Sequence, residues 1–139
     1  MRTPIRAAVV AIASAAAVSA PAAAHAVPSP ARPFATVTAL LGTYDFGRAA
    51  VIGRAGKQAG AWKSYTVRSG FAGDDLTVTY KPRIIPLRSE KQIYTAAFNE
   101  SRDAEAECRK VGDDGVARKV WVSFRCRTGF APSYTLLVR

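Results

Sequence analysis

The sequence predicts a small α+β domain: an antiparallel sheet of short strands, with one helix joined to it by a disulfide bond. Three observations predict this class. Alternating apolar and polar residues recur between turns rich in glycine and aspartate, and one stretch has the periodicity and capping residues of a helix. The only two cysteines lie on that helix and on the strand after it. No internal repeat stands out.

The first 26 residues have the organisation of a secretory signal peptide. Residues 1–6 carry two arginines without an acid, residues 7–20 are uncharged and largely apolar, and Ala24 and Ala26 supply the small residues that signal peptidase reads. The apolar run is short for a membrane span, and no later stretch is long enough to be one. We therefore expect a secreted, extracellular protein cleaved after Ala26, with cleavage after Ala24 as the alternative.

Removal of residues 1–26 changes the composition in two ways. The formal net charge falls from +10 to +8, because Arg2 and Arg6 are lost without any acid. The only histidine, His25, is lost as well. Residues 27–33 carry three prolines and are expected to form a flexible lead. Residues 34–139 are then of a size for a single domain with its own core.

The N-terminal half of this domain favours strands. Residues 34–41 are apolar enough for a strand, although a short helix would fit as well. Residues 42–60 contain five glycines, which favour loops or short irregular strands. Residues 61–68 and 76–81 flank a turn rich in glycine and aspartate and predict a hairpin.

Two further segments lead to the helix. Residues 83–88 contain Pro86 and predict an edge strand or a linker, and residues 91–98 predict another strand. Ser101 can then cap a helix with acids in its first turns and with Arg109 and Lys110 near its end, as the helix dipole prefers. Gly112 supplies a C-terminal stop, followed by a turn at residues 113–115.

The two cysteines fall on the apolar faces of their elements. Cys108 shares a helical face with Ala104 and Val111, and Cys126 belongs to the apolar side of an alternating run that begins at Val120. Two thiols in a small exported domain are usually bridged. We therefore expect a Cys108–Cys126 disulfide that stabilises the fold by about 3 kcal/mol.

The C-terminal segment predicts a second hairpin. The alternation from Val120 is followed by a loop at residues 128–133 and by a second alternating run at residues 134–139. This pattern places Trp121 and Leu137 on the face away from the helix. We expect Trp121 to be buried there beneath another part of the chain.

Motifs for catalysis or cofactor binding are not apparent, so we expect a non-enzymatic protein without cofactor or metal. The run GRAGKQ at residues 53–58 suggests a phosphate loop, but Val51 stands where the first glycine is required and no Ser or Thr follows Lys57. Without histidine or free cysteine, metal centres built on them and His-dependent catalysis are excluded. The acidic pairs lie beside glycines, where aspartate favours turns: Asp74-Asp75 and Asp113-Asp114.

Basic residues are concentrated toward the C-terminus. Residues 109–139 contain seven lysines and arginines against two acids. We expect an anionic partner, either an anionic polymer or an acidic protein at the cell envelope, and nucleic acid also stays open. The candidate surface consists of Arg118, Lys119, Arg125 and Arg127. The alternative is a solvated basic surface that binds nothing.

The run AEAECRKVGDDGVARKVWVSFRC, together with YTLLV, resembles the C-terminal part of small secreted actinobacterial proteins. In these proteins a Cys-containing helix, a Gly turn, a Trp strand, a second Cys and a Tyr-x-Leu strand recur. The resemblance covers about the last 40 residues. It implies export and a disulfide, but it transfers no site residue, because no function is established for those proteins.

Three function classes follow, in this order. A secreted, non-catalytic basic protein that binds a ligand or associates with the cell envelope fits the charge and the lack of catalytic groups. A secreted inhibitor or toxin-like effector could present residues 115–119 or 128–133 to another protein. An enzyme comes third, since no catalytic constellation is visible.

Overall fold

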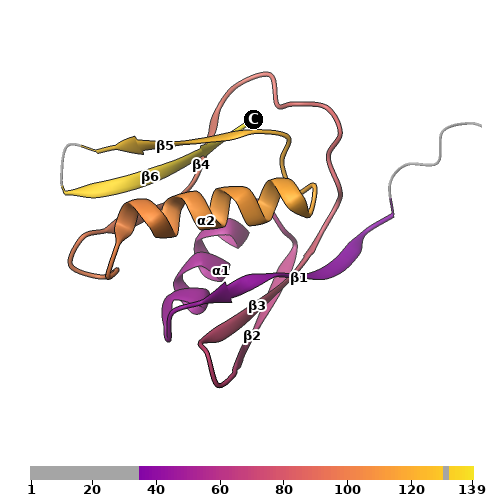
Figure 1. Cartoon of the computed structure of the whole chain (residues 1–139). Coiled ribbons are helices and arrows are strands. Elements are labelled where there is room, and N and C mark those ends of the chain that lie inside the picture. Colours follow the sequence, from indigo (N-terminus) through magenta and orange to yellow (C-terminus); the bar gives the residue numbers. More distant parts are fainter. Residues whose placement is uncertain (1–34, 130–131) are drawn as a thin grey trace, which may run out of the picture. The chain divides into compact units, whose positions relative to one another are not determined.

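The computed structural model describes residues 35–129 and 132–139, so the expected signal peptide (1–26) and proline-rich lead (27–33) lie outside the described residues. The elements follow one another in this order (Figure 1): β1 (Val37–Tyr44), α1 (Arg48–Gln58), β2 (Ser64–Ser69), β3 (Asp74–Tyr80), β4 (Lys91–Ala97), α2 (Ala104–Ala117), β5 (Phe124–Thr128) and β6 (Ser133–Val138). The α+β class is confirmed. The expected single helix is not, because the described part of the chain contains two.

The strands form two antiparallel sheets of three strands each, in the orders β1-β3-β2 and β4-β6-β5. Both predicted hairpins are confirmed as β2–β3 and β5–β6, and the strand expected at residues 91–98 is β4. Residues 34–41 overlap β1, which decides between strand and helix. Residues 83–88 contain no strand and belong to the linker between β3 and β4.

The two sheets belong to two halves of the domain, residues 37–80 and residues 91–138, which have the same order of elements. Each half is a strand, a helix and a hairpin, and in each sheet the first strand pairs with the last. Each first strand also has one bulge, which leaves Leu41 and Ile93 unpaired and buried. The hairpins match in register: Tyr65–Val78 and Val67–Leu76 in one, Phe124–Val138 and Cys126–Leu136 in the other. The structure therefore shows an internal repeat that was not apparent from the sequence.

A tryptophan holds each helix to the hairpin that follows it. The indole Nε1 of Trp62 donates a hydrogen bond to the Gly53 carbonyl at 2.8 Å, and that of Trp121 donates to the Gly112 carbonyl at 2.9 Å. The two rings also meet each other, with centroids 6.4 Å apart. The halves therefore contact each other through equivalent residues.

Glycines let these rings approach the helices. A Cβ on Gly56 or Gly115 would lie 1.9 or 2.0 Å from the indole of its own half, which no side chain can do. The glycines therefore serve helix packing here and do not mark loops or ends. For this reason α1 forms within residues 42–60, where loops were expected, and α2 continues beyond its expected stop at Gly112. In both helices the glycines are packing positions on the buried face.

Three local expectations were wrong. The N-cap of α2 is Asp103, whose carboxylate accepts from the Ala106 amide at 2.9 Å, whereas Ser101 donates to Glu107 instead. Residues 113–115 are helical rather than a turn. Trp121 is buried as expected but packs against α2, because β5 begins only at Phe124.

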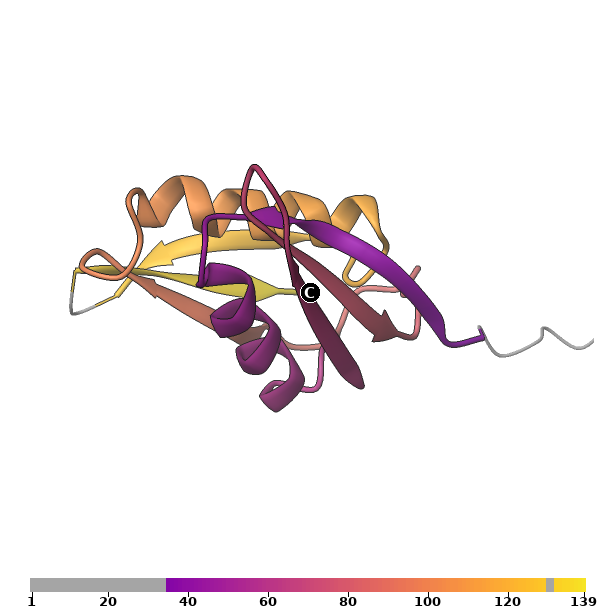
Figure 2. The same cartoon turned by 90° about the horizontal axis from the view of Figure 1, so that it is seen from below.

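The halves share one hydrophobic core. Each helix packs mainly on its own hairpin, and each also contacts the first strand of the other half, α1 on β4 and α2 on β1. In the view of Figure 1, α2 runs between the two sheets, and Figure 2 shows the same helix alongside β5 and β6. The buried apolar residues of both halves form a single cluster.

Candidate functional site

Basic residues meet where α2 ends. The Tyr80 hydroxyl donates to the carbonyl of Arg118, the C-cap residue of α2, and the Arg83 amide donates to the Lys119 carbonyl at 2.7 Å. These bonds hold the segment after β3 against the end of the helix. Arg83, Arg118 and Lys119 are exposed, so three cationic side chains from two distant segments share this end of the domain.

A groove of about 310 Å³ opens beside the same segment. The charged residues that line it are all basic, namely Lys63, Lys81 and Arg83. Its other lining residues are Thr36, Gly60, Ala61, Trp62 and Tyr80. We call this groove together with Arg118 and Lys119 the basic groove. It gives a cationic rim around a partly aromatic floor.

The structure divides the four residues that were expected to form one surface. Arg118 and Lys119 lie at the end of α2, whereas Arg125 and Arg127 lie on the exposed face of β5. Arg125 is also ion-paired with Glu90, which neutralises part of the strand's charge. The sequence did not single out Lys63, Lys81 or Arg83, because they come from other segments and only the fold brings them together.

At the N-terminal ends of the helices, Arg48 and Glu107 form a buried ion pair. The Arg48 Nη2 lies 2.9 Å from Glu107 Oε1, Nε donates to both carboxylate oxygens, and each side chain is only 9% exposed. Tyr94 and Ser101 also donate to Glu107. Burial by itself raises the pKa of Glu107, but these hydrogen bonds and the Arg48 charge outweigh it and lower the pKa below its ordinary value. A carboxylate with this many donors has a structural role.

A second cavity of about 250 Å³ lies at this end, between β1 and the start of α2. Its residues include Tyr44, whose hydroxyl donates to Asp114 at 2.9 Å. Burial, followed by the nearby Asp114 charge, raises the pKa of Tyr44, so the phenol stays protonated. Within the described residues, no three metal-ligating side chains come together. The carboxylates that line this cavity are those of Asp45, Asp103 and Glu107.

The two aspartate pairs have different roles. Asp74 supports a turn, as expected: its carboxylate accepts from the Gly47 amide at 2.6 Å and from the Ser69 hydroxyl at 2.7 Å. These bonds lower its pKa. Asp114 lies in α2 and accepts from Tyr44 and Lys110, so the turn expected there is absent.

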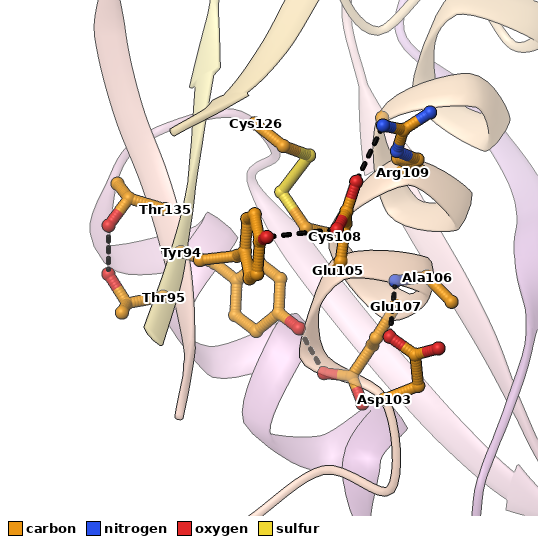
Figure 3. The surroundings of a disulfide bond; sticks show 12 residues. Tyr94, Thr95, Asp103, Glu105, Ala106, Glu107, Cys108, Arg109, Cys126 and Thr135 are labelled. Atoms are coloured by element: carbon orange, nitrogen blue, oxygen red, sulfur yellow. Dashed lines mark hydrogen bonds and ion pairs between the residues drawn. A yellow bond between two sulfur atoms is a disulfide. The ribbon is translucent and has the colours of Figure 1, made fainter. Parts of the chain in front are cut away.

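The Cys108–Cys126 disulfide is confirmed. It joins α2 to β5, with the two Cα atoms 6.1 Å apart (Figure 3). Beside it, the Tyr134 hydroxyl donates to Glu105 at 2.9 Å and adds a second link between α2 and the sheet. The bridge closes the hairpin onto its helix and leaves no free cysteine among the described residues.

Comparison of the chain with protein-family models, with curated proteins and with solved structures finds no match. The resemblance to small secreted actinobacterial proteins therefore stays a prediction. In the part of the chain that the structure describes, no helix is long and apolar enough to cross a membrane.

Proposed function

We propose that the protein is an exported, non-catalytic binding protein that holds an anionic polymer of the cell envelope in the basic groove. The observation that carries this proposal is a groove whose charged lining residues, Lys63, Lys81 and Arg83, are all cationic. The backbone carbonyls of Arg118 and Lys119 accept hydrogen bonds from Tyr80 and Arg83 of this lining, which brings two further cationic residues next to it. The expected signal peptide supports export, and the disulfide suits an oxidising compartment.

The shape and charge of the basic groove suit a polymer better than a single ion. Three cations from two segments line it, so they can contact several anionic groups along one chain. Charges on a solvated rim raise the local concentration of an anionic ligand, and their effect is screened beyond about 8 Å at physiological salt. Binding should therefore weaken as salt rises.

The test compares two sets of neutralised cations with a soluble poly(glycerol phosphate) as the probe. Lys63→Gln/Lys81→Gln/Arg83→Gln should weaken binding about tenfold or more, because it removes the three cations that line the groove. The matched control, Arg54→Gln/Arg68→Gln/Arg102→Gln, removes the same charge from exposed positions elsewhere. Titration calorimetry at two salt concentrations measures both. Equal losses from the two sets would show diffuse attraction and would overturn the proposal.

A variant of the other predicted cations locates the surface more closely. Arg125→Gln/Arg127→Gln should reduce binding less than the groove variant, since Arg125 is already paired with Glu90. A larger loss from this pair would move the site to the outer face of β5. All the substituted residues are exposed, so the melting temperatures of these variants should stay close to that of the unmodified protein.

A further inference from the structure

The linker that joins the two halves exposes two adjacent isoleucines. Equivalent residues of the halves lie 59 positions apart, as Trp62 and Trp121 do, and residues 81–90 belong to neither half. Within this linker Ile84 is 59% exposed and Ile85 is 74% exposed, although isoleucine is among the residues most often buried. In Figure 1 the linker runs as an irregular loop outside both sheets. The folded domain therefore leaves most of both side chains in water.

The chain is attached to the domain on both sides of the isoleucines. The Arg83 amide donates to the Lys119 carbonyl at 2.7 Å, and the partly buried Leu87 packs against the hydrophobic core. Pro82 and Pro86 restrict the backbone at and between these two points. A segment held in this way has little conformational freedom to lose when it binds, which lowers the entropic cost of binding.

The surroundings of the isoleucines are cationic. The exposed cations of the linker and of the adjoining end of α2 are Lys81, Arg83, Arg88, Arg118 and Lys119. Residues 81–89 contain no acid. The linker's last residue, Glu90, is ion-paired with Arg125, and Asp113 of α2 lies more than one helical turn before Arg118. The isoleucines are therefore flanked by positive charge that these acids do not balance.

An apolar tip among cations is complementary to an anionic lipid surface. Cations attract the anionic headgroups, and apolar side chains bury themselves at the boundary between the headgroups and the acyl chains. A soluble polyanion would use the cations but would give the isoleucines nothing apolar to contact. The net charge of +8 after removal of residues 1–26 favours the same partner, since the whole molecule is attracted to an anionic bilayer.

The other strongly exposed apolar pair lies at the opposite end of β3, where the charges are mixed. Phe46 and Phe71 are 66% and 106% exposed, on the turns after β1 and after β2. Around them Asp45 is exposed and Asp75 is partly exposed, against one exposed cation, Arg68. This end matches the linker in exposed apolar residues but not in charge, so it serves as a control.

We propose that residues 81–88 dock the protein on an anionic lipid bilayer, with Ile84 and Ile85 in the lipid and the surrounding cations on the headgroups. This interaction goes beyond the proposed polymer binding. Neither isoleucine lines the basic groove, whereas Lys81 and Arg83 belong to both sites. Docking therefore places the basic groove next to the bilayer.

The first test measures co-sedimentation of the secreted protein with lipid vesicles. Vesicles that contain phosphatidylglycerol should bind it, and pure phosphatidylcholine vesicles should not, because their surface carries no net charge. Ile84→Ser/Ile85→Ser should weaken binding about tenfold or more, although it keeps every charge of the protein. The matched control, Phe46→Ser/Phe71→Ser, should bind as the unmodified protein does.

A second test places a fluorophore at the tip of the linker. The native Trp62 and Trp121 are buried, so Ile85→Trp adds an exposed indole. Its emission should shift to shorter wavelength when phosphatidylglycerol vesicles are added, because indole rings leave bulk water at a membrane interface. Phe71→Trp should show no shift with the same vesicles.

Four results would overturn the proposal. The first three are no binding to phosphatidylglycerol vesicles, undiminished binding by Ile84→Ser/Ile85→Ser, and an equal loss from Phe46→Ser/Phe71→Ser. The fourth is a loss of poly(glycerol phosphate) binding in Ile84→Ser/Ile85→Ser, which would assign the isoleucines to the polymer. Unchanged polymer binding by this variant is the expected result, and it shows separately whether the basic groove functions.

Discussion

The two halves of the domain reach the same arrangement with and without a covalent bond. In the C-terminal half a disulfide joins α2 to β5, whereas the equivalent positions of the N-terminal half hold Ala49 and Val67. Both hairpins nevertheless have the same register, and both helices contact their tryptophan in the same way. The comparison shows that glycine–tryptophan packing is common to both halves and is sufficient for their shared arrangement. The disulfide adds stability to the C-terminal half alone.

The halves also differ where they meet. Arg48 and Glu107 occupy equivalent positions, yet they carry opposite charges and form a buried pair. Two identical halves would place like charges there and would repel each other. The two copies are therefore matched to each other and are not interchangeable.

Removal of either tryptophan should have the largest effect. Trp62→Ala or Trp121→Ala should each cost about 4–5 kcal/mol, because each leaves a large cavity and an unpaired glycine carbonyl. Trp→Phe at either site should cost less, about 1–2 kcal/mol, since it keeps most of the volume. Urea unfolding measures both. Similar costs in the two halves support the shared design, and a negligible cost in the disulfide-bonded half would contradict it.

Removal of one partner of the buried ion pair should cost about 3–4 kcal/mol. Arg48→Ala leaves the Glu107 carboxylate buried without its cation. Glu107→Arg alone should reduce the free energy of unfolding by a similar amount. The exchange Arg48→Glu/Glu107→Arg should recover part of that stability. A double-mutant cycle of unfolding free energies measures the coupling. Additive effects would show that the pair does not match the halves to each other.

The same pair implies a pH dependence. The folded-state pKa of Glu107 is lowered, so its contribution is complete above the unfolded value of about 4.3 and is lost as pH falls through the folded value. The stability difference between the unmodified protein and Glu107→Gln should therefore shrink below about pH 4. A difference that stays constant down to pH 2 would contradict this account.

Moving the disulfide should have the smallest effect of the three changes. Cys108→Ala/Cys126→Ala should cost about 2–3 kcal/mol, the entropy of an 18-residue separation. Adding Ala49→Cys/Val67→Cys in that background places cysteines at the equivalent positions with the same separation and should restore most of the loss. Peptide mapping without reductant detects the new bridge. Its failure to form would show that the two halves differ more than their registers indicate.

Much of this architecture is predictable from the sequence because it depends on neighbouring residues. Alternation with a period of two identifies both hairpins and β4, and turn residues mark where each hairpin reverses. The disulfide is predictable because both cysteines fall on apolar faces of adjacent elements. For the candidate surface, the sequence grouped Arg118 and Lys119 with Arg125 and Arg127, whereas the structure places the two pairs on different elements.

Only the tertiary structure decided the rest, since it depends on contacts between distant residues. A glycine costs a helix about 1 kcal/mol relative to alanine, so Gly53, Gly56, Gly112 and Gly115 predict loops when each segment is considered alone. Indole rings from the following strand region reverse that preference, because they occupy the space that a Cβ would fill. The division into two sheets, the Arg48–Glu107 pair and the basic groove likewise join segments far apart in the chain. The sequence by itself determined the hairpins, β4 and the disulfide, because these depend on neighbouring residues. Long-range packing decided the extent of the helices, the division into two halves and the position of the basic groove.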